Sequence, residues 1–122
     1  MTEAKLKSVL VKKLREAMPN AVIFRIEDRL THGIPDICIF AGGMSSFIEV
    51  KYGNPSYKVT GIQELTIKRL DREGMFAAFL IYQEKDGIKT TRMEKPSGLW
   101  AEKEGFDHDW VVDLLKNIVH GF

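Results

Sequence analysis

The first clear hydrophobic pattern lies near the start of the chain. Four apolar residues recur there at helical spacing: Leu6, Leu10, Leu14 and Ala17. Thr2 can cap the first turn, and Pro19 stops the pattern. We therefore predict a helix over residues 3–17.

The next segments have the pattern of strands. Residues 21–28 alternate between apolar and other side chains. Two more strands, 34–40 and 46–52, flank the pair Gly42-Gly43, which supplies the positive φ that a tight hairpin turn needs. These segments predict three successive strands, the last two of which form a hairpin.

A second helix is expected over residues 61–73. Thr60 and Gln63 have capping-box spacing before it, and Gly74 follows it. The almost wholly apolar run 75–82 comes next. A helix between a hairpin and such a run indicates a crossover to a strand that is buried on both faces.

The last third of the chain has a weaker pattern. A turn at 84–87 precedes an antiparallel strand at 88–94, and an amphipathic helix is expected at 109–119. Residues 99–108 give no clear assignment. The predicted order is helix, three strands, helix, two strands and helix, in one domain over residues 1–122. This order predicts an α/β fold with a mixed central β-sheet flanked by helices.

Composition agrees with one soluble globular domain, because 44% of the 122 residues are apolar. The formal net charge is +1, so any surface that binds nucleic acid must be a local patch. The N-terminal segment is charged and amphipathic, which argues against a signal peptide or a membrane span.

The single cysteine and the histidines limit the chemistry. Cys38 excludes a disulfide within the chain and lies in an apolar run, so we expect a buried structural thiol and a cytoplasmic protein. The three histidines are far apart in sequence and lack cysteine partners at zinc spacing. We therefore expect no zinc site.

The hairpin carries unexpected charges. A symmetric turn about Gly42-Gly43 places Asp36 opposite Glu49, with Lys51 on the same face. Opposed carboxylates destabilise a sheet unless a cation lies between them, and oxygen ligands favour Mg²⁺ or Mn²⁺. Alternatively, Glu49 and Lys51 form a solvated pair and Asp36 caps a turn. A three-residue turn would also shift the register and separate the three residues.

Glu3 falls within about 20° of Leu10 on a helical wheel, whereas Glu16 lies about 120° away and should be solvated. Glu3 is therefore either part of a frayed helix end or a third acid directed at the sheet.

The hairpin acids and the segments around them resemble the motif of a known protein family. The segment GIPDICIF followed by FIEVK and the helix TGIQELTIKRLDREG resembles the VRR-Nuc family of the PD-(D/E)XK nuclease superfamily, which is similar to archaeal Holliday-junction resolvases. The resemblance covers residues 3–82 and implies a restriction-endonuclease-like fold. Residues 92–110 match no pattern of the family, so the C-terminal third is interpreted as an addition of unknown role.

The resemblance also implies roles for individual residues. Asp36, Glu49 and the carbonyl of Val50 would bind one or two Mg²⁺ ions, and Glu3 would complete the metal shell. Lys51 would position the attacking water. The family's glutamine corresponds to Gln63, which either forms the capping box or points to the active site.

Four residues near the hairpin's open end are candidates for DNA contacts: Arg25, Arg29, His32 and Lys58. Each alone is more often a solvated surface charge.

The implied function is that of a metal-dependent, structure-selective DNA endonuclease acting on branched DNA such as Holliday junctions, rather than on a small-molecule substrate. Symmetric cutting of two strands implies a homodimer, and a phage or prophage source fits a small standalone member. Trp100, Phe106 and Trp110 belong either to that interface or to the core. The alternatives are a non-catalytic nucleic-acid-binding module and a nuclease subunit that needs a partner protein.

Overall fold

The computed structural model describes residues 1–26 and 33–120. The elements are α1 (Glu3–Ala17), β1 (Val22–Arg25), β2 (Ile37–Ala41), β3 (Met44–Gly53), α2 (Gly61–Arg72), β4 (Phe76–Lys85), β5 (Ile88–Lys95), β6 (Gly98–Glu104) and α3 (His108–His120). The six strands form one sheet in the order β1-β2-β3-β4-β5-β6. The predicted α/β fold with a mixed sheet and flanking helices is confirmed.

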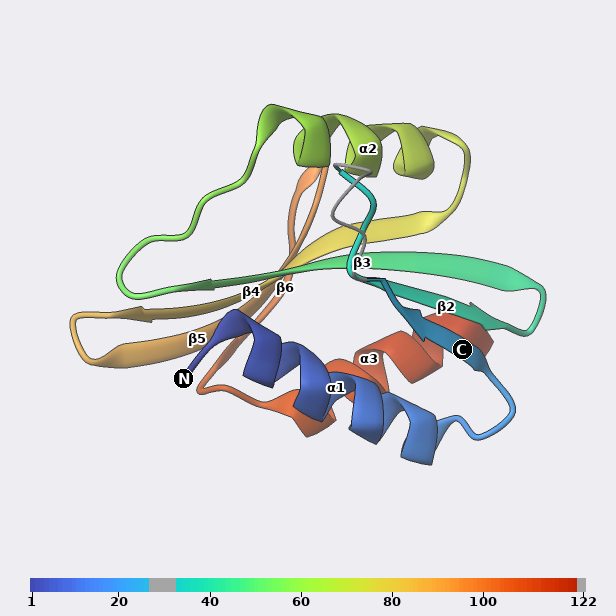
Figure 1. Ribbon diagram of the computed structural model, residues 1–122, viewed down its shortest axis with the longest axis horizontal. Helices are drawn as coiled ribbons and strands as arrows, with labels where there is room; N and C mark the ends of the chain where they lie inside the picture. The colour runs from blue at the N-terminus through green and yellow to red at the C-terminus, as the bar shows by residue number, and fades with distance from the viewer. Residues whose placement is uncertain (27–32, 121–122) are drawn as a thin grey trace.

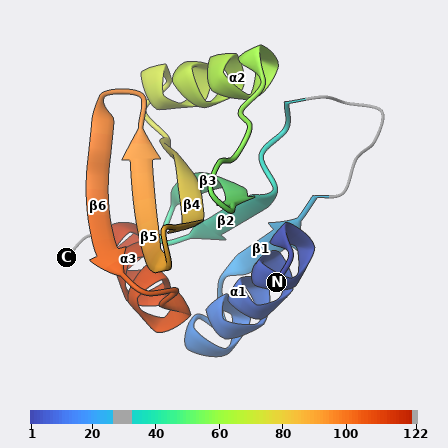
Figure 2. The same ribbon diagram turned by 90° about the vertical axis from the view of Figure 1, so that its left-hand side faces the viewer.

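The helices cover both faces of the sheet. Helices α1 and α3 pack on one face, and α2 crosses the other face on its way from β3 to β4 (Figures 1 and 2). That crossover makes β3 and β4 parallel, whereas the other neighbouring strands are antiparallel. As predicted, β4 is buried along most of its length, because helices lie on both sides of it.

The main core lies between the sheet and the α1–α3 layer. The apolar stripe of α1 is fully buried there at Leu6, Leu10 and Leu14, which are each at most 1% exposed. Thr2 caps α1 by accepting a hydrogen bond from Lys5 N, as predicted. The sequence pattern therefore determines both the limits of α1 and the face that it buries.

Strand β6 differs from the sequence prediction, which left this segment unassigned. Every residue of β6 except Ala101 is exposed, because β6 lies at the edge of the sheet and has no helix over it. An edge strand without a buried face lacks the alternating pattern by which strands are predicted. Trp100 lies on β6 with its ring 5.3 Å from that of Phe76, whereas Phe106 and Trp110 pack against the core.

Strand β2 begins at Ile37, three residues later than predicted. Pro35 lacks the N–H that a ladder needs, which explains the late start. The predicted strand at 21–28 is found at Val22–Arg25, and residues 27–28 lie outside the described residues.

Two other expectations concern the burial of Cys38 and the presence of a membrane span. Cys38 is 3% exposed, and burial raises the pKa of its thiol to about 11, in agreement with a structural thiol. In residues 1–26 and 33–120, no helix has the length and apolar character needed to cross a membrane.

Candidate functional site

The hairpin register brings Asp36 and Glu49 together. Ile37 pairs with Ile48 across the two strands, so Asp36, one residue before β2, stands opposite Glu49. Gly42 and Gly43 both have positive φ (58° and 76°), as a two-residue hairpin turn requires. The predicted register is therefore confirmed.

The backbone around Asp36 fixes its carboxylate. Asp36 O accepts a hydrogen bond of 2.7 Å from Ile26 N, which extends the pairing of β1 and β2. Asp36 Oδ2 accepts one of 2.8 Å from Val50 N on β3. This carboxylate is thus bonded to the backbone of the strand that carries Glu49 and Lys51.

Glu49 is almost completely buried, with 4% exposure. Burial raises the pKa of its carboxyl group to about 8, and the charge of Asp36 and a hydrogen bond with it act in the same direction. Gln63 Nε2 donates a hydrogen bond of 3.2 Å to Glu49 Oε1. Glu49 is therefore protonated at neutral pH unless a further cation compensates its charge.

Lys51 lies two residues beyond Glu49 on the same face of β3 and is 8% exposed. Its positive charge lowers the pKa of both Glu49 and Glu3. A solvated pair on an edge strand, the alternative considered for Glu49 and Lys51, does not describe them. Both side chains are buried, and β3 lies inside the sheet.

Helix α1 adds two charged side chains to the cluster. Glu3 is half-buried, and burial raises the pKa of its carboxyl group, although the charges of Lys51 and Lys7 oppose that rise. Asp36 also raises the pKa of Glu3. The N-terminal turn of α1 therefore places Glu3 in the electrostatic environment of the hairpin acids, while Glu16 is exposed as expected.

Lys7 was not identified from the sequence. Its Nζ lies 3.1 Å from Asp36 Oδ1, and the side chains are 19% and 14% exposed. Lys7 follows Glu3 by one helical turn, so the two residues lie on the same face of α1. That spacing was the signal that could have found Lys7, because a helix face that brings an acid to the sheet also brings the residue four positions later.

Gln63 forms the predicted capping box and also contacts Glu49 in the hairpin cluster. Its Oε1 accepts a hydrogen bond of 3.1 Å from Thr60 N, and its backbone N donates to Thr60 Oγ1, which completes the capping box. Its Nε2 donates to Glu49. One amide serves both partners because its oxygen and its nitrogen are separate groups.

Two of the four candidate DNA contacts, Arg25 and Lys58, lie in the part of the chain that the structure describes. Arg25 Nη1 donates a hydrogen bond of 2.6 Å to Ser8 Oγ on α1. Lys58 is exposed in the segment between β3 and α2. Arg29 and His32 lie outside the described residues.

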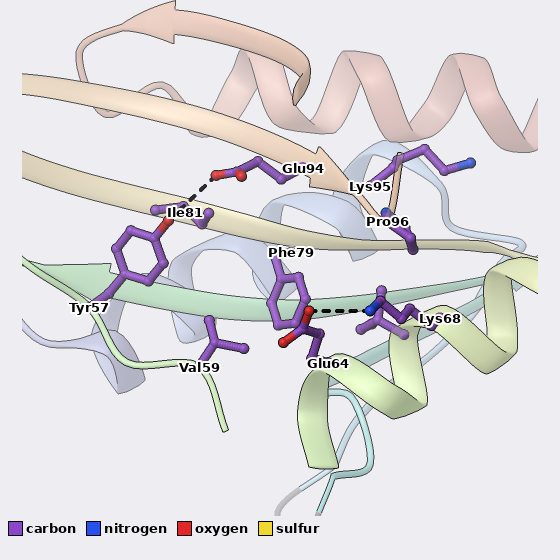
Figure 3. Close-up of a pocket in the computed structure, with 10 residues that line it drawn as sticks. Tyr57, Val59, Glu64, Lys68, Phe79, Ile81, Glu94, Lys95 and Pro96 are labelled. Carbon is purple, nitrogen blue, oxygen red and sulfur yellow. Dashed lines mark hydrogen bonds and ion pairs between the residues drawn. The ribbon is translucent and has the colours of Figure 1, made fainter. Parts of the chain in front are cut away.

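A pocket of about 230 Å³ lies beside the cluster, between α2, the segment before it, and strands β4 and β5 (Figure 3). Phe79, which pairs with Glu49 across β3 and β4, lines it. The charged groups that line the pocket bond to protein partners. Lys68 Nζ lies 3.4 Å from Glu64 Oε1, and Glu94 Oε2 accepts a hydrogen bond from Tyr57 OH. The carboxylates of the hairpin do not line this pocket, so the candidate chemistry lies outside it.

The hairpin cluster offers oxygen donors of the kind that bind hard divalent ions. Asp36 and Glu49 are adjacent, and the raised pKa of Glu49 is the property expected of a buried carboxylate pair that a cation would neutralise. Among the described residues, no group of three or more His, Cys, Asp or Glu side chains has an arrangement that suits a metal. A metal here would therefore need backbone or water oxygens in addition to the two carboxylates.

No protein-family model matches the chain, and no curated protein matches it at a significant level.

Proposed function

We propose that the protein is a metal-dependent DNA endonuclease that hydrolyses phosphodiester bonds in branched DNA. The observation that carries this proposal is the juxtaposition of Asp36 and Glu49 across the hairpin, with Lys51 buried on the same face. The order of these residues along the chain resembles that of the PD-(D/E)XK nucleases and their VRR-Nuc branch.

The residues of the hairpin cluster divide into those that would bind the metal ion and those that would act in the reaction. Asp36, Glu49 and the Val50 carbonyl would hold Mg²⁺, for which Mn²⁺ would substitute, with water molecules completing the shell and the charge of Glu3 acting beside it. When bound there, the ion supplies charge stabilisation for the pentacovalent phosphate and the leaving oxygen.

Lys51 is proposed to orient the attacking water. Its ammonium lies on the face that carries the carboxylates, and a protonated lysine cannot itself be a metal ligand. Gln63 is a positioning residue in this scheme, because its hydrogen bond fixes Glu49 Oε1 relative to α2.

Purified protein should be incubated with labelled four-way junction, flap and linear duplex DNA, with Mg²⁺ and with EDTA. The proposal expects Mg²⁺-dependent cleavage that favours a branched substrate and is lost in Asp36→Asn and Lys51→Ala. Full activity of either variant would refute the assignment of these residues.

The same assay separates the alternative functions. Binding of DNA without cleavage under any condition would indicate a non-catalytic binding module. Activity that appears only with a second protein would indicate a nuclease subunit. Because symmetric cutting of a junction needs two active sites, we also propose a homodimer, which gel filtration tests.

A further inference from the structure

The basic residues of the chain are concentrated on α1. This helix carries five Lys or Arg residues and two Glu residues, whereas the formal net charge of the whole chain is only +1. The remainder of the chain is therefore net acidic. A polyanion would meet a favourable local potential at α1.

Part of this charge lines a groove between α1 and β1. The groove has a volume of about 420 Å³, and the described residues that line it are Ser8, Val11, Lys12, Arg15, Glu16 and Arg25. Three of these six are cations, and Glu16 is the one acid among them.

Both arginines donate hydrogen bonds to the protein. Arg15 Nη2 donates one of 3.1 Å to Ile23 O, and Arg25 Nη1 donates to Ser8 Oγ. The neutral carbonyl of Ile23 orients the Arg15 guanidinium without cancelling its charge. Lys12 is exposed and takes part in no ion pair with the described residues.

Helix α1 connects this groove with the hairpin cluster. Glu3 and Lys7 lie near its N-terminus, and Lys12 and Arg15 lie in its second half. A helix of 15 residues is about 22 Å long, which corresponds to about six base pairs of duplex.

We propose that the groove formed by Lys12, Arg15 and Arg25 binds the sugar-phosphate backbone of a duplex arm of the substrate, next to the strand that is cut. This inference rests on the proposed nuclease function. The groove contributes affinity that is independent of base sequence, because its charged groups are suited to phosphates rather than to base edges.

The test uses the Asp36→Asn protein, so that binding is measured without cleavage. Its affinity for a four-way junction is measured over a range of salt concentrations, alone and combined with Lys12→Glu or Glu16→Lys. Lys116→Glu on α3 is the matched control, because Lys116 is also an exposed helical lysine but lies outside the groove.

We expect Lys12→Glu to weaken binding about tenfold and to make the slope of log K against log salt shallower by about one. Glu16→Lys should strengthen binding and make the slope steeper, and Lys116→Glu should change neither.

Unchanged affinity and slope in both groove variants, in a protein that binds junction DNA, would overturn the inference and leave the proposed function standing. If the Asp36→Asn protein binds no DNA and the unaltered protein cleaves none, the proposed function and this inference fall together.

Discussion

Lys7 Nζ lies 3.1 Å from Asp36 Oδ1, while Val50 N donates a hydrogen bond to the other oxygen of the same carboxylate. Both oxygens of Asp36 therefore have partners on the protein, one on α1 and one on β3. A divalent ion bound by Asp36 would compete with the Lys7 ammonium for Oδ1. The charge of Lys7 also acts on Glu49 and Glu3, whose pKa values it lowers.

Removing the competing ammonium should favour metal binding. We expect Lys7→Met, which keeps most of the alkyl chain, to raise the affinity for Mn²⁺ about fivefold, or about 1 kcal/mol. Calorimetric titration without DNA measures this directly. Lys7→Arg keeps the charge and should bind the ion as weakly as the unaltered protein. Equal affinities in Lys7→Met and the unaltered protein would show that Lys7 does not compete.

The raised pKa of Glu49 predicts that stability depends on pH. Between the ordinary value of 4.5 and about 8, the unfolded chain loses the Glu49 proton and the folded chain keeps it. The contribution of Glu49 to the free energy of unfolding should therefore be largest below pH 4.5, decrease as the pH rises to 8, and then level off. Urea unfolding in the presence of a chelator, at several pH values, measures this decrease.

Glu49→Gln is the matched variant, because glutamine resembles a protonated glutamic acid in shape. We expect it to be more stable than the unaltered protein at pH 9, by roughly 5 kcal/mol, and equally stable at pH 4. A stability difference that does not change with pH would show that Glu49 does not titrate in this way.

The two roles of Gln63 can be separated by mutation. Thr60→Ala removes the cap of α2 and should cost about 1 kcal/mol of stability, with metal affinity unchanged. Gln63→Ala should cost a similar amount and also weaken metal binding, because Glu49 loses its hydrogen bond. Urea unfolding and Mn²⁺ titration of both variants test this. Equal metal affinity in the two variants would mean that the contact with Glu49 is not needed.

Cys38 should be inert in the folded protein. It is buried, and the pKa of its thiol is about 11, so the reactive thiolate is scarce at pH 8. We expect a thiol reagent to modify Cys38 only at the rate of unfolding, and rapidly once urea is added. Fast modification without denaturant would contradict its buried position.

The arrangement of the hairpin could be predicted from sequence because it depends on local rules. Two glycines set the turn, the turn sets the register, and the period of two along a strand places Lys51 beside Glu49. The limits of α1 were predictable for the same reason, since its cap and its apolar stripe are both local features.

The parts that were not predicted depend on tertiary contacts. Lys7 looks like an ordinary surface lysine until α1 is docked against Asp36. Strand β6 has almost no buried side chain, so it depends on hydrogen bonding to β5 rather than on its own pattern. The sequence left open whether Gln63 reaches the site of Glu49, because that contact depends on where the crossover places α2.

The Gly42-Gly43 turn has a consequence for how this chain tolerates insertions. Asp36 lies six residues before the turn, so roughly 20 Å of chain separate them. One extra residue in the turn would nevertheless carry Asp36 out of line with Glu49. A Cβ atom at Gly42 would also lie 2.8 Å from Val119 O on α3, so the turn is constrained by packing as well. A change of loop length at this remote position would therefore separate Asp36 from Glu49 as effectively as a mutation of either residue.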